Sequence, residues 1–296
     1  MKVKKCLIGT LLGLIILAVT GCSTRDTNEI ETFEEETSVG MATSASEETQ
    51  PDEIVIIKDP HLEEMIRDQI GKPEGELTTL DMEMVYSLNI DYREYPVYEI
   101  DGLEYAIYLG DFSYRYGALK SLSPIAELEN LTYLNISYST IEEIPKTFKT
   151  ILLSRLSFIE TNVNALDFLS ELTNITNAHL TRSGITSIGF LENWDKVEEL
   201  NLSENEIEDI SPLEEKKSLT RLTLHKNKVE DISVLETLEA LEILNISYNE
   251  VANISPIMQL EFLQEFTAYE DLDQKIIDRG LLQALEDKGV RVQYHE

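Results

Sequence analysis

The sequence predicts an α/β solenoid, a right-handed superhelix in which short repeats build one parallel sheet. A recurring phrase is the first observation: LTYLNISY begins at Leu131 and LEILNISY begins at Leu241. Rows of 22 residues align both phrases with five further copies, which begin at Leu109, Leu153, Ile175, Val197 and Leu219. One row of this length cannot bury its own apolar side chains, so the rows must stack on one another.

Six apolar positions recur in the rows, at residues 1, 4, 6, 11, 14 and 17 of each row. Residues 4 and 6 alternate with polar residues, as expected of a strand with one buried face. Residues 11, 14 and 17 are spaced by three, which favours turns or a short 3₁₀ helix. Proline stands at residue 16 of three rows, as Pro124, Pro212 and Pro256. It supports a short element because proline lacks an amide donor.

Two incomplete rows flank the regular ones. A degenerate row begins at Ser87 and a partial row begins at Leu263, which brings the expected number of repeat strands to nine. We expect these strands to lie side by side on a concave face, with the 3₁₀ segments on the convex side.

The pattern L-x-x-L-x-L-x-x-N-x-I with this period resembles the bacterial leucine-rich repeats of the internalin type, over roughly residues 54–296. The resemblance implies one parallel strand per row on the concave face, and recognition of a protein partner. It also implies an inward asparagine at row residue 9, which only Asn205, Asn227 and Asn249 supply. Hydroxyl side chains can replace it more weakly at Ser139, Thr161 and Ser183, whereas Gly117 and Tyr95 cannot do so in the same way.

The first residues predict export and lipidation. Residues 1–21 combine three lysines with an apolar run at residues 7–19, which is short for a membrane span. An ordinary secretory signal would also fit. The four residues that end at Cys22, VTGC, resemble the bacterial lipobox, in which the cysteine is acylated after cleavage. We therefore expect a protein anchored by lipid at Cys22 on the outer face of a bacterial cell membrane, and its mature chain would retain no free thiol.

The remaining boundaries follow from composition and helix signals. Residues 22–53 hold ten acidic residues and one basic residue, which predicts a disordered acidic tether. Asp59, Pro60 and Gly71 mark the start and stop of a helix, and a second helix is expected near Thr79. The expected parts are a signal peptide at 1–21, the tether at 22–53, a helical N-terminal cap at 54–86, repeats at 87–272 and a C-terminal cap of helix and strand at 273–296.

The charge restricts the partners. A formal net charge of −32 opposes binding to nucleic acid or to an anionic membrane surface, and it favours a basic partner. The same acidity would also keep an exported protein soluble, and the charge alone does not separate these two interpretations.

The sequence gives little sign of catalysis. Ser157, His179 and Asn201 share row residue 5 in consecutive rows, but a solvent-open column of this kind is more readily a polar ladder than a catalytic triad. His179 and His225 fall two rows apart, about 10 Å by strand spacing alone, too far to share one zinc ion. Phosphate-binding, dinucleotide-binding and metalloprotease motifs are absent from the sequence. We therefore expect no enzyme activity, no metal and no cofactor.

Exposed tyrosine and arginine residues are the better functional candidates. Residue 8 of the central rows alternates in sign through Glu160, Arg182, Glu204 and Lys226, which can satisfy one another. The tyrosines that flank this run have no such explanation, and both residue types are enriched at binding hot spots. The expected binding residues of the concave face are Arg115, Tyr116, Tyr133, Tyr138, Arg155, Arg182 and Tyr248. A protein or peptide ligand is the first hypothesis, an envelope glycan stacked on the tyrosines is the second, and an undetected enzyme is the third.

Overall fold

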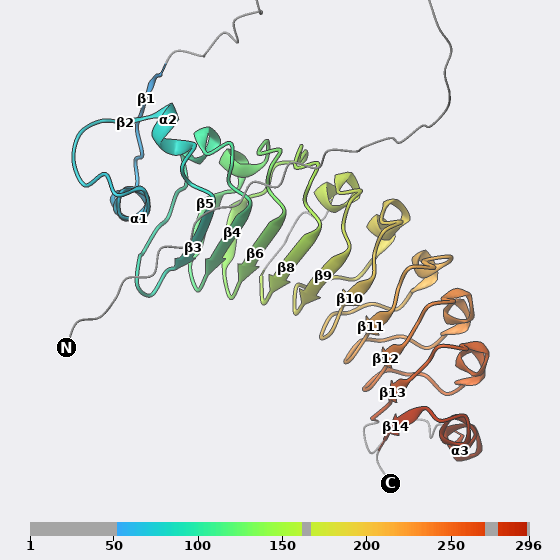
Figure 1. Ribbon diagram of the computed structural model, residues 1–296. Helices are drawn as coiled ribbons and strands as arrows, with labels where there is room; N and C mark the ends of the chain where they lie inside the picture. The colour runs from blue at the N-terminus through green and yellow to red at the C-terminus, as the bar shows by residue number, and fades with distance from the viewer. Residues whose placement is uncertain (1–51, 162–166, 270–277, 295–296) are drawn as a thin grey trace, which may run out of the picture. The chain divides into compact units, whose positions relative to one another are not determined.

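Ten parallel strands lie side by side in one sheet, in the order β14-β13-β12-β11-β10-β9-β8-β6-β4-β3 (Figure 1). The computed structural model describes residues 52–161, 167–269 and 278–294, all within the compact unit Gln50–Glu296. The strands are β3 (Ser87–Asp91), β4 (Asp111–Arg115), β6 (Tyr133–Ser137), β8 (Arg155–Ile159), β9 (Asn177–Thr181), β10 (Glu199–Asn201), β11 (Arg221–Thr223), β12 (Ile243–Asn245), β13 (Glu265–Thr267) and β14 (Arg291–Gln293). The predicted nine repeat strands and the strand of the C-terminal cap are all present.

Several predicted features lie outside the described residues. These are the signal peptide at residues 1–21, the lipidation residue Cys22, the tether up to residue 51 and the boundary between residues 272 and 273. Across the part of the chain that is described, every helix is too short or too polar to cross a membrane.

The row spacing fixes the register of the sheet. Glu199 pairs with Arg221, which pairs with Ile243, so each step along these strands is 22 residues. The first step is longer, because Ser87 pairs with Asp111, 24 residues on. The alignment predicted for the row at Ser87 was therefore wrong by two residues. Burial of Leu88 and Ile90 is the reason: these two side chains, and not Ile90 and Tyr92, fill the core beside the next strand.

The 3₁₀ helices confirm the other half of the predicted row. They are η1 (Leu103–Tyr105), η2 (Ser123–Ile125), η3 (Asp167–Glu171), η4 (Gly189–Asn193), η5 (Ser211–Leu213), η6 (Ser233–Thr237) and η7 (Ser255–Gln259). Pro124, Pro212 and Pro256 each take the second residue of such a helix, where no amide donor is needed. The row that begins at Leu131 differs, since its β7 (Thr140–Glu143) pairs with β5 (Ala118–Ser121) in a second, two-stranded parallel sheet that the sequence analysis did not predict.

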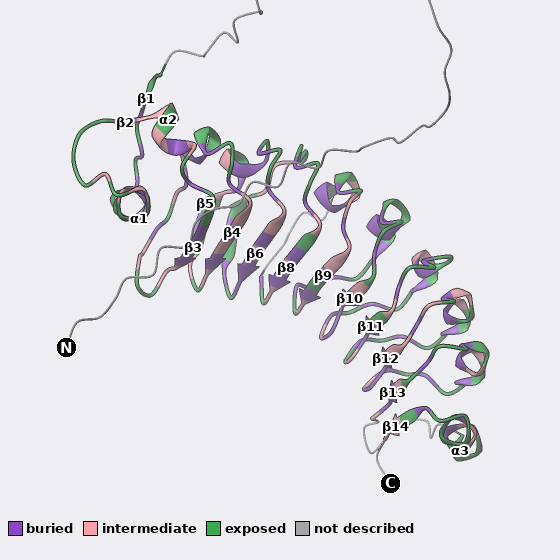
Figure 2. Ribbon diagram, viewed as in Figure 1, coloured by how far each residue is buried: buried purple, intermediate pink, exposed green. Residues whose placement is uncertain are grey.

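A continuous apolar core lies between the strands and the 3₁₀ helices, and Figure 2 shows buried residues, in purple, on both kinds of element. All six apolar positions of the row at Leu219 are exposed by 1% or less: Leu219, Leu222, Leu224, Val229, Ile232 and Leu235. Trp194 is fully buried in the same core, and its Nε1 donates to the carbonyl oxygen of Leu169 at 2.9 Å. The rows therefore bury their apolar positions against one another, as stacking requires.

Both ends of the core are covered. At the N-terminal end lie β1 (Ile54–Val55) paired antiparallel with β2 (Leu77–Thr78), α1 (Pro60–Ile70) and α2 (Thr79–Met82). Asp59 begins α1 by accepting from the backbone amides of His61 and Leu62, and Gly71 ends it in the left-handed conformation. At the other end, α3 (Arg279–Asp287) precedes β14. The predicted helical cap and the predicted helix and strand cap are thus both found.

Candidate functional site

We call the exposed face of the ten-stranded sheet, together with the residues that follow each strand at its carboxyl end, the sheet face. In β6, Leu134 and Ile136 are fully buried, whereas Tyr133 and Asn135 are partly exposed on the opposite side. Row residues 3 and 5 therefore point outward. The expected binding residues occupy row residues 3, 7 and 8 of this face.

Row residue 8 has an unusual backbone conformation in every full row. Its φ lies between 49° and 65°, in the left-handed region that side chains with a Cβ avoid at a cost of about 1–2 kcal/mol. The seven residues are Tyr116, Tyr138, Glu160, Arg182, Glu204, Lys226 and Tyr248. Each still donates its amide to the row that follows, as Lys226 does to the Ser247 oxygen at 2.8 Å. This strain was not predictable from residue type, because none of the seven is glycine or asparagine.

Row residue 9 satisfies the backbone groups that this sharp turn frees. The Oδ1 of Asn227 accepts from the amide of Ile207 at 3.1 Å, and its Nδ2 donates to the carbonyl oxygens of Leu202 and Leu224. Thr161 performs part of the same task, since its hydroxyl donates to the Ile136 oxygen at 2.9 Å. The predicted replacement of asparagine by hydroxyl residues is confirmed.

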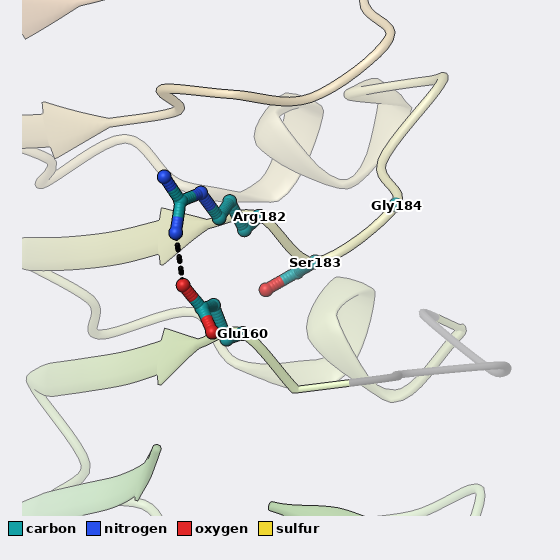
Figure 3. A pocket seen from close by; sticks show the side chains of 4 residues that line it. All are labelled: Glu160, Arg182, Ser183 and Gly184. Atoms are coloured by element: carbon teal, nitrogen blue, oxygen red, sulfur yellow. Dashed lines mark hydrogen bonds and ion pairs between the residues drawn. The ribbon is translucent and has the colours of Figure 1, made fainter. Parts of the chain in front are cut away.

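The central residues at row position 8 form an ion-pair ladder, as their alternating charges predicted. Arg182 contacts Glu160 on one side and Glu204 on the other, with 2.8 Å between its Nε and Glu204 Oε2. Figure 3 shows the first of these pairs beside a hollow of about 490 Å³. Hydrogen bonding from Arg182 lowers the pKa of Glu204. Lys226 lies 3.7 Å from the same carboxylate. Arg182, an expected binding residue, is therefore already engaged by two carboxylates.

Two expected tyrosines form a stacked pair at the carboxyl end of β4 and β6. The rings of Tyr116 and Tyr138 lie 5.0 Å apart between centroids and 7° from parallel, with 37% and 45% of each residue exposed. The guanidinium carbon of Arg93 lies 3.7 Å from the centroid of Tyr116, an arrangement that favours a cation over the ring face. Asp91 holds Arg93 through both carboxylate oxygens, and these hydrogen bonds lower the pKa of Asp91 to about 2. Sequence analysis missed this role of Arg93, because the first row was misaligned.

A second group lies at the other end of the same strands. Tyr133 and Arg155 begin β6 and β8, and the guanidinium carbon of Arg155 lies 5.0 Å from the Tyr133 ring centroid. Arg155 also contacts Asp111 at 3.2 Å. Tyr133 begins β6 and Tyr138 directly follows its last residue, so the two tyrosines are separated by the length of the strand, roughly 16 Å. Five of the expected binding residues thus divide into two groups: Tyr116 and Tyr138 form the first, and Arg115 lines the hollow of the second beside Tyr133 and Arg155.

Tyr248 stands apart from both groups. It follows β12, five strands from β6, which corresponds to about 24 Å at the usual strand spacing. Its ring meets that of His225 edge to face at 5.2 Å. Burial lowers the pKa of His225, which favours the neutral imidazole. The structure therefore gives Tyr248 a local packing partner and not a place beside the other tyrosines.

The polar column at row residue 5 is present, but its side chains do not form the hydrogen-bonded arrangement of a catalytic triad. Ser157 pairs in register with His179, which pairs with Asn201. Asn201 Oδ1 accepts from the amide and the hydroxyl of Ser203 at 3.0 and 2.6 Å, so it is not available to orient the imidazole. His179 is exposed. Within the described ranges, no cluster of three or more histidine, cysteine, aspartate or glutamate side chains is arranged to hold a metal ion.

Comparison with known proteins identifies the architecture. The sequence matches no family model and no curated protein. Among solved structures, internalin C2 from Listeria monocytogenes superposes with a TM-score of 0.57 at 23% identity, covering 80% of this chain and 93% of that one. The fold is a leucine-rich-repeat solenoid. The functional domain of InlJ from the same organism gives a TM-score of 0.51 at 15% identity, covering 80% of this chain and 59% of that one.

These likenesses establish the fold alone. The InlJ domain is described as including a cysteine ladder. Both cysteines of this chain, Cys6 and Cys22, precede its rows, so no cysteine column runs through this solenoid. The shared architecture is therefore maintained here by apolar, asparagine and hydroxyl columns.

Proposed function

We propose that this chain is a lipid-anchored protein on the outer face of a bacterial cell membrane, and that its leucine-rich repeats recognise a protein ligand through the sheet face without catalysis. The stacked pair of Tyr116 and Tyr138 carries the proposal. Two large aromatic rings, exposed by 37% and 45%, lie together on a rigid support instead of packing into the core. Tyrosine and arginine dominate the energetic centres of protein interfaces.

The support makes these side chains effective. Each strand of the sheet is paired on both sides except at its two ends, so the backbone under the tyrosines is held before a ligand arrives. Arg93 and Arg155 are held in turn by Asp91 and Asp111. Little conformational freedom remains to be lost on binding, which improves affinity without added contact area.

The central ion-pair ladder provides a contrast on the same face. Arg182 forms ion pairs with both neighbouring glutamates, and exposed ion pairs of this kind contribute little to binding or stability. We therefore place the energetic centre of the interface over the first strands, from β3 to β8, and assign Arg182 and Tyr248 to its periphery.

The anchor and the charge complete the proposal. The lipobox-like sequence that ends at Cys22 supports acylation, and the acidic segment that follows supports a tether between membrane and repeats. The net charge of −32 favours a ligand with a basic surface, because long-range attraction raises its rate of association.

Crosslinking on intact cells tests this function. A photoreactive residue at position 138 is expected to capture a discrete protein, and capture at a second labelled site on the face is expected to fall when Tyr116 and Tyr133 are both changed to alanine. Tyr105→Ala is the matched control, since this tyrosine is 40% exposed on η1, away from the sheet. If the double variant captures as much protein as the unsubstituted chain, the sheet face is not the binding surface. If envelope glycan is captured and protein is not, the ligand is a glycan.

A further inference from the structure

A hollow on the sheet face near its first strands is lined by groups that donate hydrogen bonds. It measures about 420 Å³ and spans β3, β4, β6 and β8. Asn89 and Ser113 pair in register on its floor, Arg115 lies toward the carboxyl ends of the strands, and Tyr133 and Arg155 lie toward their beginnings. Most of the side chains that line the hollow are therefore polar and able to hydrogen-bond a ligand.

Arg115 is the unusual member of this lining. Within the described residues its guanidinium forms no hydrogen bond, and its buried Nε has no partner. The nearest carboxylate oxygen, Oδ2 of Asp91, is 3.9 Å from Nη2, and Arg93 already hydrogen-bonds both oxygens of that carboxylate. A buried donor without an acceptor is costly, and because 37% of the Arg115 side chain is exposed, an acceptor from outside can reach the rest of the guanidinium.

The neighbouring groups would serve the same acceptor. Ser113 Oγ accepts from Asn135 Nδ2 at 2.9 Å, which leaves the hydroxyl hydrogen of Ser113 to donate elsewhere. Asn89 is exposed and carries two amide donors. The only carboxylate in the lining, that of Asp111, is neutralised by Arg155 at 3.2 Å. In a chain with a net charge of −32, this hollow thus combines several donors with a guanidinium that shares its nearest carboxylate with Arg93.

We propose that the hollow is a carboxylate-binding subsite, in which Arg115 holds an acidic group of a peptide or protein ligand and Asn89 and Ser113 donate to it. A guanidinium and a carboxylate match in charge and in planar geometry, which makes such contacts strong and directional. The exposed ring of Tyr133 offers apolar surface for the residue beside the acidic group. The subsite rests on the proposed function and adds local chemistry to it. The basic surface of the ligand would attract it to the chain, and one acidic group would fix its position by binding Arg115.

Three short peptides distinguish the sources of such a group. They share one tyrosine-containing sequence and carry a glutamate with an amidated end, a glutamine with a free carboxyl end, or a glutamine with an amidated end. Binding to the purified full chain is followed by the side-chain Nε–H nuclear magnetic resonance signal of Arg115, assigned by its loss in Arg115→Lys. We expect at least one of the two charged peptides to shift this signal and the neutral peptide to leave it unchanged. The charged peptide that binds more tightly shows whether the subsite prefers a side-chain carboxylate or a C-terminal carboxylate.

Substitution provides the second readout. Arg115→Gln is expected to weaken the charged peptide by about tenfold, the effect of losing one charge-assisted hydrogen bond. Arg221→Gln is the matched control, because it removes an arginine of the same face that Glu199 already pairs at 3.5 Å, and it is expected to change affinity by less than about twofold. Unchanged affinity in Arg115→Gln, equal binding of all three peptides, or no binding by both charged peptides would overturn the subsite. Crosslinking through position 138 reads the proposed function independently, so the two failures are separable.

Discussion

The ring of Tyr138 lies flat against that of Tyr116, with 5.0 Å between the centroids, directly beyond the ends of the adjacent strands β6 and β4. Both residues have positive φ, so the backbone accepts strain to place them there. Arg93, which follows β3, covers the other face of the Tyr116 ring. The guanidinium and the two rings therefore form one stack across three neighbouring rows. Two tyrosines of the proposed interface therefore stand at the least favourable backbone positions of their rows.

Replacing a strained residue by glycine should stabilise the solenoid. Lys226 has φ of 54°, so Lys226→Gly is expected to raise the free energy of unfolding by about 1 kcal/mol, because glycine accepts the left-handed region without a Cβ clash. Chemical denaturation measures the change. Lys228→Gly, two residues on at a position without positive φ, is the control and should lower stability, since glycine there only adds freedom to the unfolded chain. The reverse order of the two variants would refute the strain at row residue 8.

Loss of a buried asparagine should be more damaging than loss of a buried hydroxyl. Asn227→Ala would leave the amide of Ile207 and the oxygens of Leu202 and Leu224 without this partner, which we expect to cost on the order of 3 kcal/mol. Thr161→Val is expected to cost about 1 kcal/mol, because that hydroxyl only donates. Equal shifts of the denaturation midpoint for the two variants would contradict the ranking.

The Asp91 carboxyl should titrate far below its ordinary range. Its pKa is lowered from 3.8 to about 2, first by hydrogen bonds from Arg93. Because the folded pKa is the lower one, the stabilising contribution is complete above pH 3.8 and is lost as the pH falls through about 2. Nuclear magnetic resonance titration of the carboxyl carbon measures the midpoint. In Arg93→Gln the midpoint should move back toward 3.8, whereas in Arg155→Gln it should stay, and an unmoved midpoint in the first variant would exclude Arg93 as the cause.

Acylation at Cys22 has a direct chemical test. Cys22→Ser is expected to shift the protein from the membrane fraction of the cell to the soluble and medium fractions, since serine cannot accept the thioether-linked lipid. Mass spectrometry of the N-terminal peptide should find an acylated cysteine at position 22 in the unsubstituted chain. Cys6→Ser is the control, because residue 6 precedes the expected cleavage point and should leave fractionation unchanged. An unmodified N-terminal cysteine would disprove the lipid anchor.

The fold was predictable because apolar residues recur at fixed spacing. A row buries Leu222 and Leu224 only if each lies over its counterparts in neighbouring rows, so the 22-residue period predicted the register from β4 to β13. The first row defeated the same reasoning. Leu88, Ile90 and Tyr92 offer two alternations of equal quality, and only the packing of Leu88 and Ile90 against β4 selects one of them.

The candidate site was less predictable for a related reason. Alternating charges in one column predicted the contacts of Arg182, because strand neighbours are known once the register is known. The same reasoning could not predict whether Arg93 or Arg115 hydrogen-bonds Asp91. Asp91 stands in register with Arg115 but hydrogen-bonds Arg93, a choice made by turn geometry beyond the end of β3.

The sequence by itself determined the repeat, the side of each strand that is buried, and the asparagine and hydroxyl columns, since all of these follow from one period and from the cost of exposing apolar surface. Only the tertiary structure decided the strained backbone at row residue 8, the small sheet of β5 and β7, and the burial of Arg115 Nε without an acceptor among the described residues. The physical reason is that burial is a property of each residue type and recurs with the period. Hydrogen bonds between exposed side chains depend on distances of a few ångströms that no period specifies.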